Sequence, residues 1–206
     1  RMGDGTLAIV DYKTGAPRKA LLQPDAKDLQ LGIYALALRE EFGEDIVGTA
    51  EYWVFSTGER GVIGITLHPD FATNGYLYLP YTTMDATGSH NRISRFTAGG
   101  DVATGGETVL VDLPSLSSAQ NHNGGGMQFG IDGRLYVGVG DNAQPALAQD
   151  RGNVFGKMLR FNADGSIPSD NPFYATQSGL ARAVWASGLR NPFSFTIQPG
   201  SGRLHV

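Results

Sequence analysis

The chain has 206 residues, a formal net charge of −4 and no cysteine. The small negative charge argues against non-specific nucleic-acid binding and against adhesion to an anionic membrane. The lack of cysteine excludes disulfides and a cysteine nucleophile, and it suits an oxidising or a reducing compartment equally. No apolar run approaches the ~18 residues of a membrane span, and the first residues do not form a signal peptide. The 29 glycines favour many tight turns and a mainly β body.

Residues 6–58 predict the order strand, loop, helix, strand. An apolar run, Thr6–Asp11, predicts a strand that ends in a carboxylate. Residues 28–42 predict a helix, because leucine, isoleucine and tyrosine recur there at helical spacing while charged residues fill the other side. Asp28 is a suitable N-cap and Gly43 a suitable stop. Residues 51–55 predict a second short strand.

After Gly58 the sequence predicts short β-strands between Gly, Asn and Asp turns, and no long helix. The strand runs are VIGITL, GYLYLPYT, RISRFT, TVLVDL, RLYVGVG and MLRF. A turn followed by a Leu-Tyr or Leu-His strand recurs three times, at intervals of about 60 to 70 residues, in HPDFATNGYLYLPY, FGIDGRLYVGV and PGSGRLHV. Repeated strand groups of this kind are typical of propeller blades.

Residues 121–142 hold the strongest candidate for chemistry. His122 precedes Gly124, Gly125 and Gly126, where the lack of side chains would let a flat ligand approach the backbone. A neutral imidazole at the rim of that space could accept a proton near pH 7. The turn at residues 131–134 predicts a hairpin. The alternative is an ordinary surface histidine beside a glycine-rich turn.

The motifs from Glu59 onward resemble those of the glucose/sorbosone dehydrogenase family. They are ERGVIGITLHPDF, NRISRFT, HNGGGMQFGIDGRLYVGVGDN, GKMLRFNADGSIPSDNPF and GLRNPFSFTIQPGSGRL, in the family's order. The resemblance implies a six-bladed β-propeller that oxidises an aldose sugar at its anomeric carbon. It also implies the cofactor PQQ, assisted by calcium.

The same resemblance implies roles for individual residues. His122 matches the general base, and Arg190 and Asn191 match a pair that faces the cofactor. Glu59 matches a polar cofactor contact that is often glutamine, and it departs from that pattern because a carboxylate would face an anionic cofactor. Asp141 and Asn142 are expected to be structural or to support the contacting residues. On residue type alone, an Arg-Asn-Pro turn is usually a structural corner.

Residues 1–58 resemble part of a PD-(D/E)XK nuclease of the RecB or Cas4 type, through DYKTG and the later QLGIY. The resemblance implies that Asp11 holds a divalent metal such as magnesium and that Lys13, two residues on, activates water. Gln30 and Tyr34 match the element that lines the active site or DNA groove. The alternative is that Asp11 and Lys13 form a surface pair and that Tyr34 lies in the core.

The sequence therefore predicts a small α/β nuclease-like segment, 1–58, followed without a linker by about half of a propeller, 59–206. Such a pairing suggests a chimeric or misjoined reading frame. Three functions follow: a PQQ sugar dehydrogenase, a metal-dependent DNA nuclease, or a non-catalytic propeller fragment. The dehydrogenase implies a periplasmic or secreted protein with a small-molecule sugar substrate, and the nuclease a cytoplasmic one that binds DNA. Since the family's later blades supply calcium and carboxylate contacts, we expect weak or no PQQ binding and little activity.

Overall fold

The structure is a computed structural model that describes residues 7–14, 47–56, 59–99 and 102–206. The chain divides into two compact units, Arg1–Gly58 and Glu59–Val206. In the first unit, β1 (Leu7–Thr14) pairs in parallel with β2 (Val47–Ser56). The strands predicted at 6–11 and 51–55 are therefore confirmed, and both are longer than predicted. The helix predicted at 28–42 lies outside the described residues.

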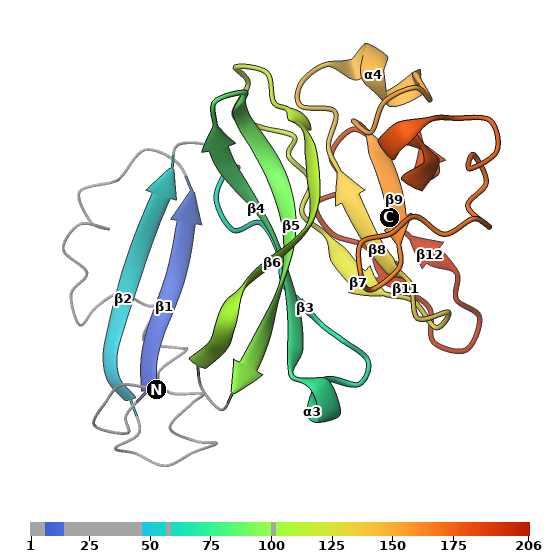
Figure 1. Ribbon diagram of the computed structural model, residues 1–206. Helices are drawn as coiled ribbons and strands as arrows, with labels where there is room; N and C mark the ends of the chain where they lie inside the picture. The colour runs from blue at the N-terminus through green and yellow to red at the C-terminus, as the bar shows by residue number, and fades with distance from the viewer. Residues whose placement is uncertain (1–6, 15–46, 57–58, 100–101) are drawn as a thin grey trace. The chain divides into compact units, whose positions relative to one another are not determined.

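The second unit begins with a four-stranded antiparallel sheet (Figure 1). Its strands lie in chain order: β3 (Thr66–Leu67), β4 (Tyr76–Asp85), β5 (Gly88–Gly99) and β6 (Val102–Ser115). The short helix α3 (Phe71–Asn74) ends at Gly75, whose φ of 66° is left-handed. The composition of residues 62–67 predicts one strand, but only β3 and a single bridge from Val62 to Tyr81 form there.

A second antiparallel sheet has the order β10-β9-β8-β7. Its strands are β7 (Met127–Phe129), β8 (Leu135–Val139), β9 (Lys157–Phe161) and β10 (Val184–Ser187). The predicted hairpin at residues 131–134 is confirmed, since Asp132 Oδ1 accepts the Arg134 N–H at 3.1 Å between paired β7 and β8. The connections carry α4 (Pro145–Gln149) and the 3-10 helix η2 (Gly179–Ala183).

A third sheet consists of β11 (Thr196–Ile197) and β12 (Leu204–His205), paired antiparallel. The three recurring turn motifs of the sequence each lie between the first two strands of a sheet: β3 and β4, β7 and β8, β11 and β12. The second unit is therefore mainly β, as predicted. None of the helices in the described part of the chain has the length and apolar character that a membrane span needs.

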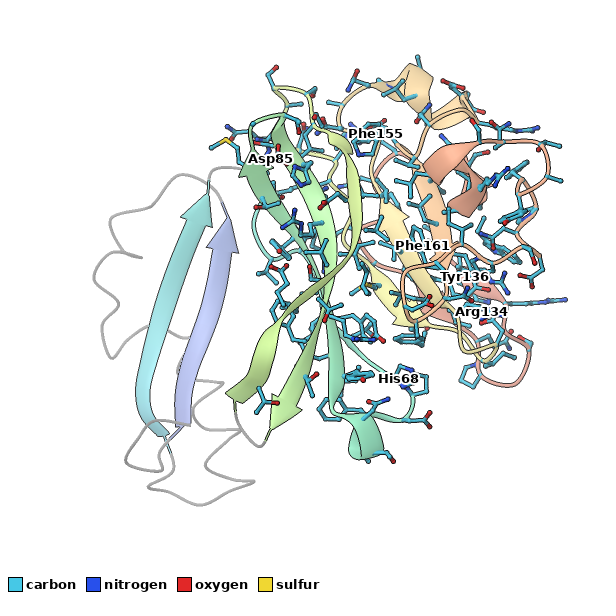
Figure 2. The ribbon with its side chains drawn as sticks, in the orientation of Figure 1. His68, Asp85, Arg134, Tyr136, Phe155 and Phe161 are labelled. Carbon is cyan, nitrogen blue, oxygen red and sulfur yellow. The ribbon has the colours of Figure 1, made fainter. Side chains whose placement is uncertain are left out.

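The second sheet is buried on both faces because its strands alternate between two apolar clusters. Leu135, Val137 and Phe161 join the cluster that includes Tyr78 and Ile93 of the first sheet. On the other face, Tyr136 and Met158 pack with Ile197 of the following sheet and with Trp185, Phe195 and Leu204. Tyr136 and Phe161 are labelled on this sheet in Figure 2. Such two-sided burial holds the loops that follow β8 and β10 in fixed positions.

Candidate functional site

The loop at His122 packs directly against the segment that follows β8. His122 has a φ of 57°, and Asn142 a φ of 50°, so both are in the left-handed region. The Asn142 N–H donates to the His122 carbonyl at 3.0 Å. Gly140 is required at this contact, because a Cβ there would lie 1.9 Å from the same carbonyl oxygen. The two loops thus bring His122 beside Asp141, 19 residues further along the chain.

His122 and Asp141 form a buried hydrogen-bonded pair. His122 Nδ1 lies 2.8 Å from Asp141 Oδ1, with side-chain exposures of 11% and 2%. An ionised carboxylate only accepts, so Nδ1 carries a proton, and in the neutral imidazole Nε2 is the nitrogen with the lone pair. The Ala143 N–H also donates to Asp141 Oδ1, at 2.9 Å, which fixes the carboxylate. Asp141 therefore orients the candidate base.

Arg190 lies in the segment after β10, and its backbone is tied to the same loop. The Asp141 N–H donates to the Arg190 carbonyl at 2.8 Å. The exposed Arg190 side chain and Asp141 both line a cavity of about 310 Å³. The other residues of the cavity wall are Pro145, Ala148, Gln149, Gly188 and Leu189. Within residues 59–99 and 102–206, no ion pair engages the Arg190 guanidinium, so it is available to an anionic ligand.

Asn191 and Glu59, the other two predicted cofactor contacts, hydrogen-bond to each other. Asn191 Nδ2 donates to Glu59 Oε2 at 3.1 Å, across 132 residues of sequence. Asn191 Oδ1 accepts the Gly124 N–H at 2.8 Å, and Glu59 Oε2 also accepts the Asn123 N–H at 3.3 Å. These bonds use both ends of the Asn191 amide to join three segments. The amide donors also explain how a carboxylate is accommodated at position 59.

The glycines after His122 serve close packing of the chain on itself. A Cβ on Gly124 would lie 2.3 Å from the Gly138 carbonyl oxygen, and one on Gly125 would lie 2.4 Å from that of Ile63. Both glycines have positive φ, 74° and 127°. The prediction that their missing side chains leave room for a flat ligand is wrong where a Cβ would stand on Gly124 and Gly125, because neighbouring backbone fills that space.

His68 packs within the turn that follows β3. Its Nδ1 accepts the Asp70 N–H at 3.0 Å, within the turn that leads into α3. The ring meets Phe129 edge-on, with centroids 5.2 Å apart, and stacks near Tyr78 at 6.3 Å. In Figure 2 His68 is labelled beside the loop that joins β3 to α3.

His90 belongs to a group of interacting side chains on β5 and β6. It is 3% exposed, and its Nε2 lies 3.2 Å from Asp112 Oδ1, while Arg92 Nε donates to the same oxygen at 2.6 Å. Sequence reasoning missed this group because its members come from different strands, β5 and β6. His205 is exposed on β12.

The nuclease-like candidates divide between described and undescribed residues. Asp11 and Lys13 lie on β1, where they pair in register with Tyr52 and Val54 of β2. Gln30 and Tyr34 lie outside the described residues. Among the residues that the structure does describe, no group of three or more His, Asp or Glu side chains could hold a metal ion.

Two cations of β9, Lys157 and Arg160, are buried, and the sequence did not predict this. Lys157 is completely buried and donates to three backbone carbonyls. The Arg160 side chain is 5% exposed and pairs with Asp132 and Asp170. No sequence signal marks either one, because a charged residue in a short strand is usually on the solvent face.

Comparison with known proteins identifies relatives of this chain. The family model described as Glucose / Sorbosone dehydrogenase matches residues 33–206. Aldose sugar dehydrogenase YliI of Escherichia coli (strain K12) is 33% identical over 154 residues, covering 73% of this chain and 41% of that protein. Quinoprotein glucose dehydrogenase B of Acinetobacter calcoaceticus is 30% identical over 172 residues, covering 71% of this chain and 35% of that protein.

A solved structure agrees with these relatives. The PQQ-bound aldose sugar dehydrogenase of Streptomyces coelicolor superimposes with a TM-score of 0.58 at 30% identity, covering 71% of this chain and 41% of that one. The chain thus spans less than half the length of each of these three proteins. The family match starts at residue 33, inside the range predicted to be nuclease-like, and none of these three matches is a nuclease. The chain belongs to the glucose/sorbosone dehydrogenase family.

Proposed function

We propose that residues 59–206 carry the general base and one cofactor-facing cation of a PQQ-dependent aldose dehydrogenase. The family match and the named activities of the relatives support the reaction class. The substrate is then a small sugar, oxidised at its anomeric carbon to a lactone, in a periplasmic or secreted protein. The sheets β3–β6, β7–β10 and β11–β12 would be successive blades, about half of a six-bladed propeller.

The observation that carries this proposal is the pairing of His122 with Asp141 at 2.8 Å. Because Nδ1 donates to the carboxylate, Nε2 is the atom that can take the proton of the anomeric hydroxyl. Asp141 then stabilises the imidazolium, as an orienting carboxylate does in a catalytic triad. PQQ, when bound, supplies the quinone that receives the hydride from C1. The hydroxyl proton goes to His122, and the C–O bond becomes the lactone carbonyl.

The described residues fit PQQ in part. The Arg190 guanidinium is exposed beside a cavity and can donate to quinone or carboxylate oxygens. Glu59 and Asn191 instead hydrogen-bond to each other and to backbone N–H groups, so in this arrangement we assign them to positioning Gly124 and Arg190. For calcium, the described part of the chain contains no acidic group of the required size. We therefore assign no residue to calcium.

Replacing Arg190 with alanine tests the cofactor assignment. We expect the affinity for PQQ, weak in the unaltered chain, to fall about ten- to hundredfold, because a charged hydrogen bond to an anion is lost. Isothermal calorimetry with PQQ and calcium measures the dissociation constant. Arg203→Ala, at an exposed position, is the matched control and is expected to bind as the unaltered chain does. Equal affinities for the two variants would contradict the assignment.

A metal-dependent DNA nuclease is the alternative for the first unit. The parallel pairing of β1 and β2 favours it, since parallel strands need a crossover connection and the second unit's sheets are antiparallel. Asp11 and Lys13 would then act on one magnesium ion. Magnesium-dependent cleavage of linear DNA, lost in Lys13→Ala and kept in Lys19→Ala, is the expected result. No cleavage by the unaltered chain would contradict a nuclease function for this chain.

A further inference from the structure

Lys157 is a buried cation beside the candidate site. It begins β9, is 0% exposed, and is the one lysine in the sequence after residue 58. Burying an ammonium group is costly unless its N–H groups are hydrogen-bonded. Burial lowers the pKa of Lys157, while the charge of Asp150 opposes that effect. The burial of this ammonium group therefore calls for hydrogen-bond acceptors around it.

The three N–H groups of the Lys157 ammonium have three carbonyl acceptors. Nζ donates to the carbonyls of Leu147 at 2.7 Å, Ala148 at 2.9 Å and Phe155 at 2.6 Å. Leu147 and Ala148 belong to α4, which forms one wall of the 310 Å³ cavity through Pro145, Ala148 and Gln149. Lys157 therefore connects this short helix to β9 through hydrogen bonds to the carbonyls of the helix.

The same carbonyl joins α4 to the opposite wall of the cavity. Ala148 O accepts both Lys157 Nζ and the Gly188 N–H, the latter at 2.8 Å. The Leu189 N–H donates to Gly156 O at 3.0 Å, and Arg190 O accepts the Asp141 N–H at 2.8 Å. A continuous set of hydrogen bonds thus runs from Lys157 through residues 188–190 to the loop that orients His122.

We propose that Lys157 is a positioning residue, whose ammonium fixes α4 and the 188–190 segment so that Arg190 and Asp141 face the cavity. The identity of the ligand, PQQ, rests on the proposed function. The role of Lys157 in fixing the cavity wall does not. Methionine has a similar length and would fill the volume of the lysine side chain. Each of the three carbonyls that accept from Lys157 would then lose that donor. Residues 188–190 would then open more often while the sheets stay paired.

The test compares Lys157→Met with Ile93→Ala, a core variant of the first sheet. Amide hydrogen exchange without PQQ is followed at Gly188 and Leu189 and at the amides of β4 and β5. In Lys157→Met we expect exchange at Gly188 and Leu189 to rise at least about tenfold more than in β4 and β5, because charged hydrogen bonds are lost locally. In Ile93→Ala both sets should rise together, as global opening requires. A uniform rise in Lys157→Met would overturn the proposal.

Calorimetry with PQQ and calcium supplies the second readout. We expect the PQQ dissociation constant to rise about tenfold in Lys157→Met, through misplacement of Arg190. An unchanged constant, with local exchange accelerated, would show a purely structural lysine and overturn the positioning role. If the unaltered chain binds no PQQ, the proposed function fails, and the exchange data alone decide whether Lys157 holds the cavity wall.

A measurement on the unaltered chain covers the case in which Lys157→Met does not fold. If Lys157 couples α4 and residues 188–190 to β9, the amides of Gly188 and Leu189 should exchange in the same opening as those of β9, with the same denaturant dependence. Exchange at Gly188 and Leu189 in a separate opening, independent of denaturant, would overturn the proposal.

Discussion

Replacing His122 with alanine is expected to lower PQQ-dependent aldose oxidation by roughly 10²- to 10⁴-fold, because the proton of the anomeric hydroxyl loses its acceptor. Turnover is measured with an electron-accepting dye at saturating PQQ and calcium. PQQ affinity should change little, since His122 is assigned to proton transfer. His205→Ala is the matched control, because His205 is exposed on a two-residue strand.

Equal turnover in His122→Ala and the unaltered chain would contradict the base assignment. If neither chain turns over under these conditions, the second unit is a non-catalytic member of its family in this form.

Asp141→Asn tests the orientation of the imidazole, because an amide can donate to Nδ1 and so favour the other tautomer. Nitrogen NMR of the imidazole should show Nδ1–H in the unaltered chain and a larger Nε2–H population in Asp141→Asn. Unchanged tautomers would contradict the orienting role of Asp141.

Replacing Arg160 with methionine is expected to lower the free energy of unfolding by about 1.5 kcal/mol, the low end for losing hydrogen bonds to a charged group. The Arg160 side chain is 5% exposed, and its Nη2 lies 2.8 Å from Asp132 Oδ2 and its Nη1 2.9 Å from Asp170 Oδ1. The guanidinium also lies 4.9 Å from the ring centre of Trp185. The low end applies because both aspartates keep contact with water. Urea unfolding measures the change.

Arg203→Met is the control for Arg160→Met, and it should unfold at the same urea concentration as the unaltered chain. An equal effect of the two variants would show that the ion cluster does not stabilise the second sheet. Because Arg160 also packs against Trp185, tryptophan emission should shift in Arg160→Met alone.

The same cluster predicts how stability depends on pH. The Arg160 guanidinium lowers the pKa of Asp170 below its ordinary 3.8. Burial raises the pKa of Asp132, but the bonds from Arg160 and from the Arg134 N–H outweigh that effect and lower it overall. Carboxylates with depressed pKa values stabilise the fold above pH 3.8, and that stabilisation is lost as pH falls through the folded-state values. The difference in stability between the unaltered chain and Arg160→Met should therefore shrink at acidic pH.

Local sequence patterns were sufficient to predict the longer strands of the second unit and its hairpin at residues 131–134, but not the short strands β10 and β11. β4, β5, β8 and β9 lie where apolar and β-branched residues cluster, and the hairpin at residues 131–134 needs only an Asp-Gly turn. The short length of β3 was not predictable, because residues 62–65 have strand-like composition and yet make only one bridge. Hydrogen-bond partners, and not residue type, decide where such a strand begins.

The candidate site was predictable by residue and only partly by role. His122 and Arg190 could be named because their motifs match a family in order. That Asn191 and Glu59 bind each other could not be read from the sequence, since 132 residues separate them. For the same reason, His90 was not connected with Asp112 of a neighbouring strand.

By itself, the sequence determined the positions of the longer strands, the turn chemistry and the family to which the chain belongs, because these depend on neighbouring residues and on motif order. Only the tertiary structure decided that Asp141 holds His122, that glycines 124 and 125 pack against backbone, and that Lys157 lies under a cavity wall. Those outcomes depend on which loops the stacked sheets bring together. A hydrogen bond between distant residues forms only when the packing on both sides of β8 and β9 has fixed the loops that carry them.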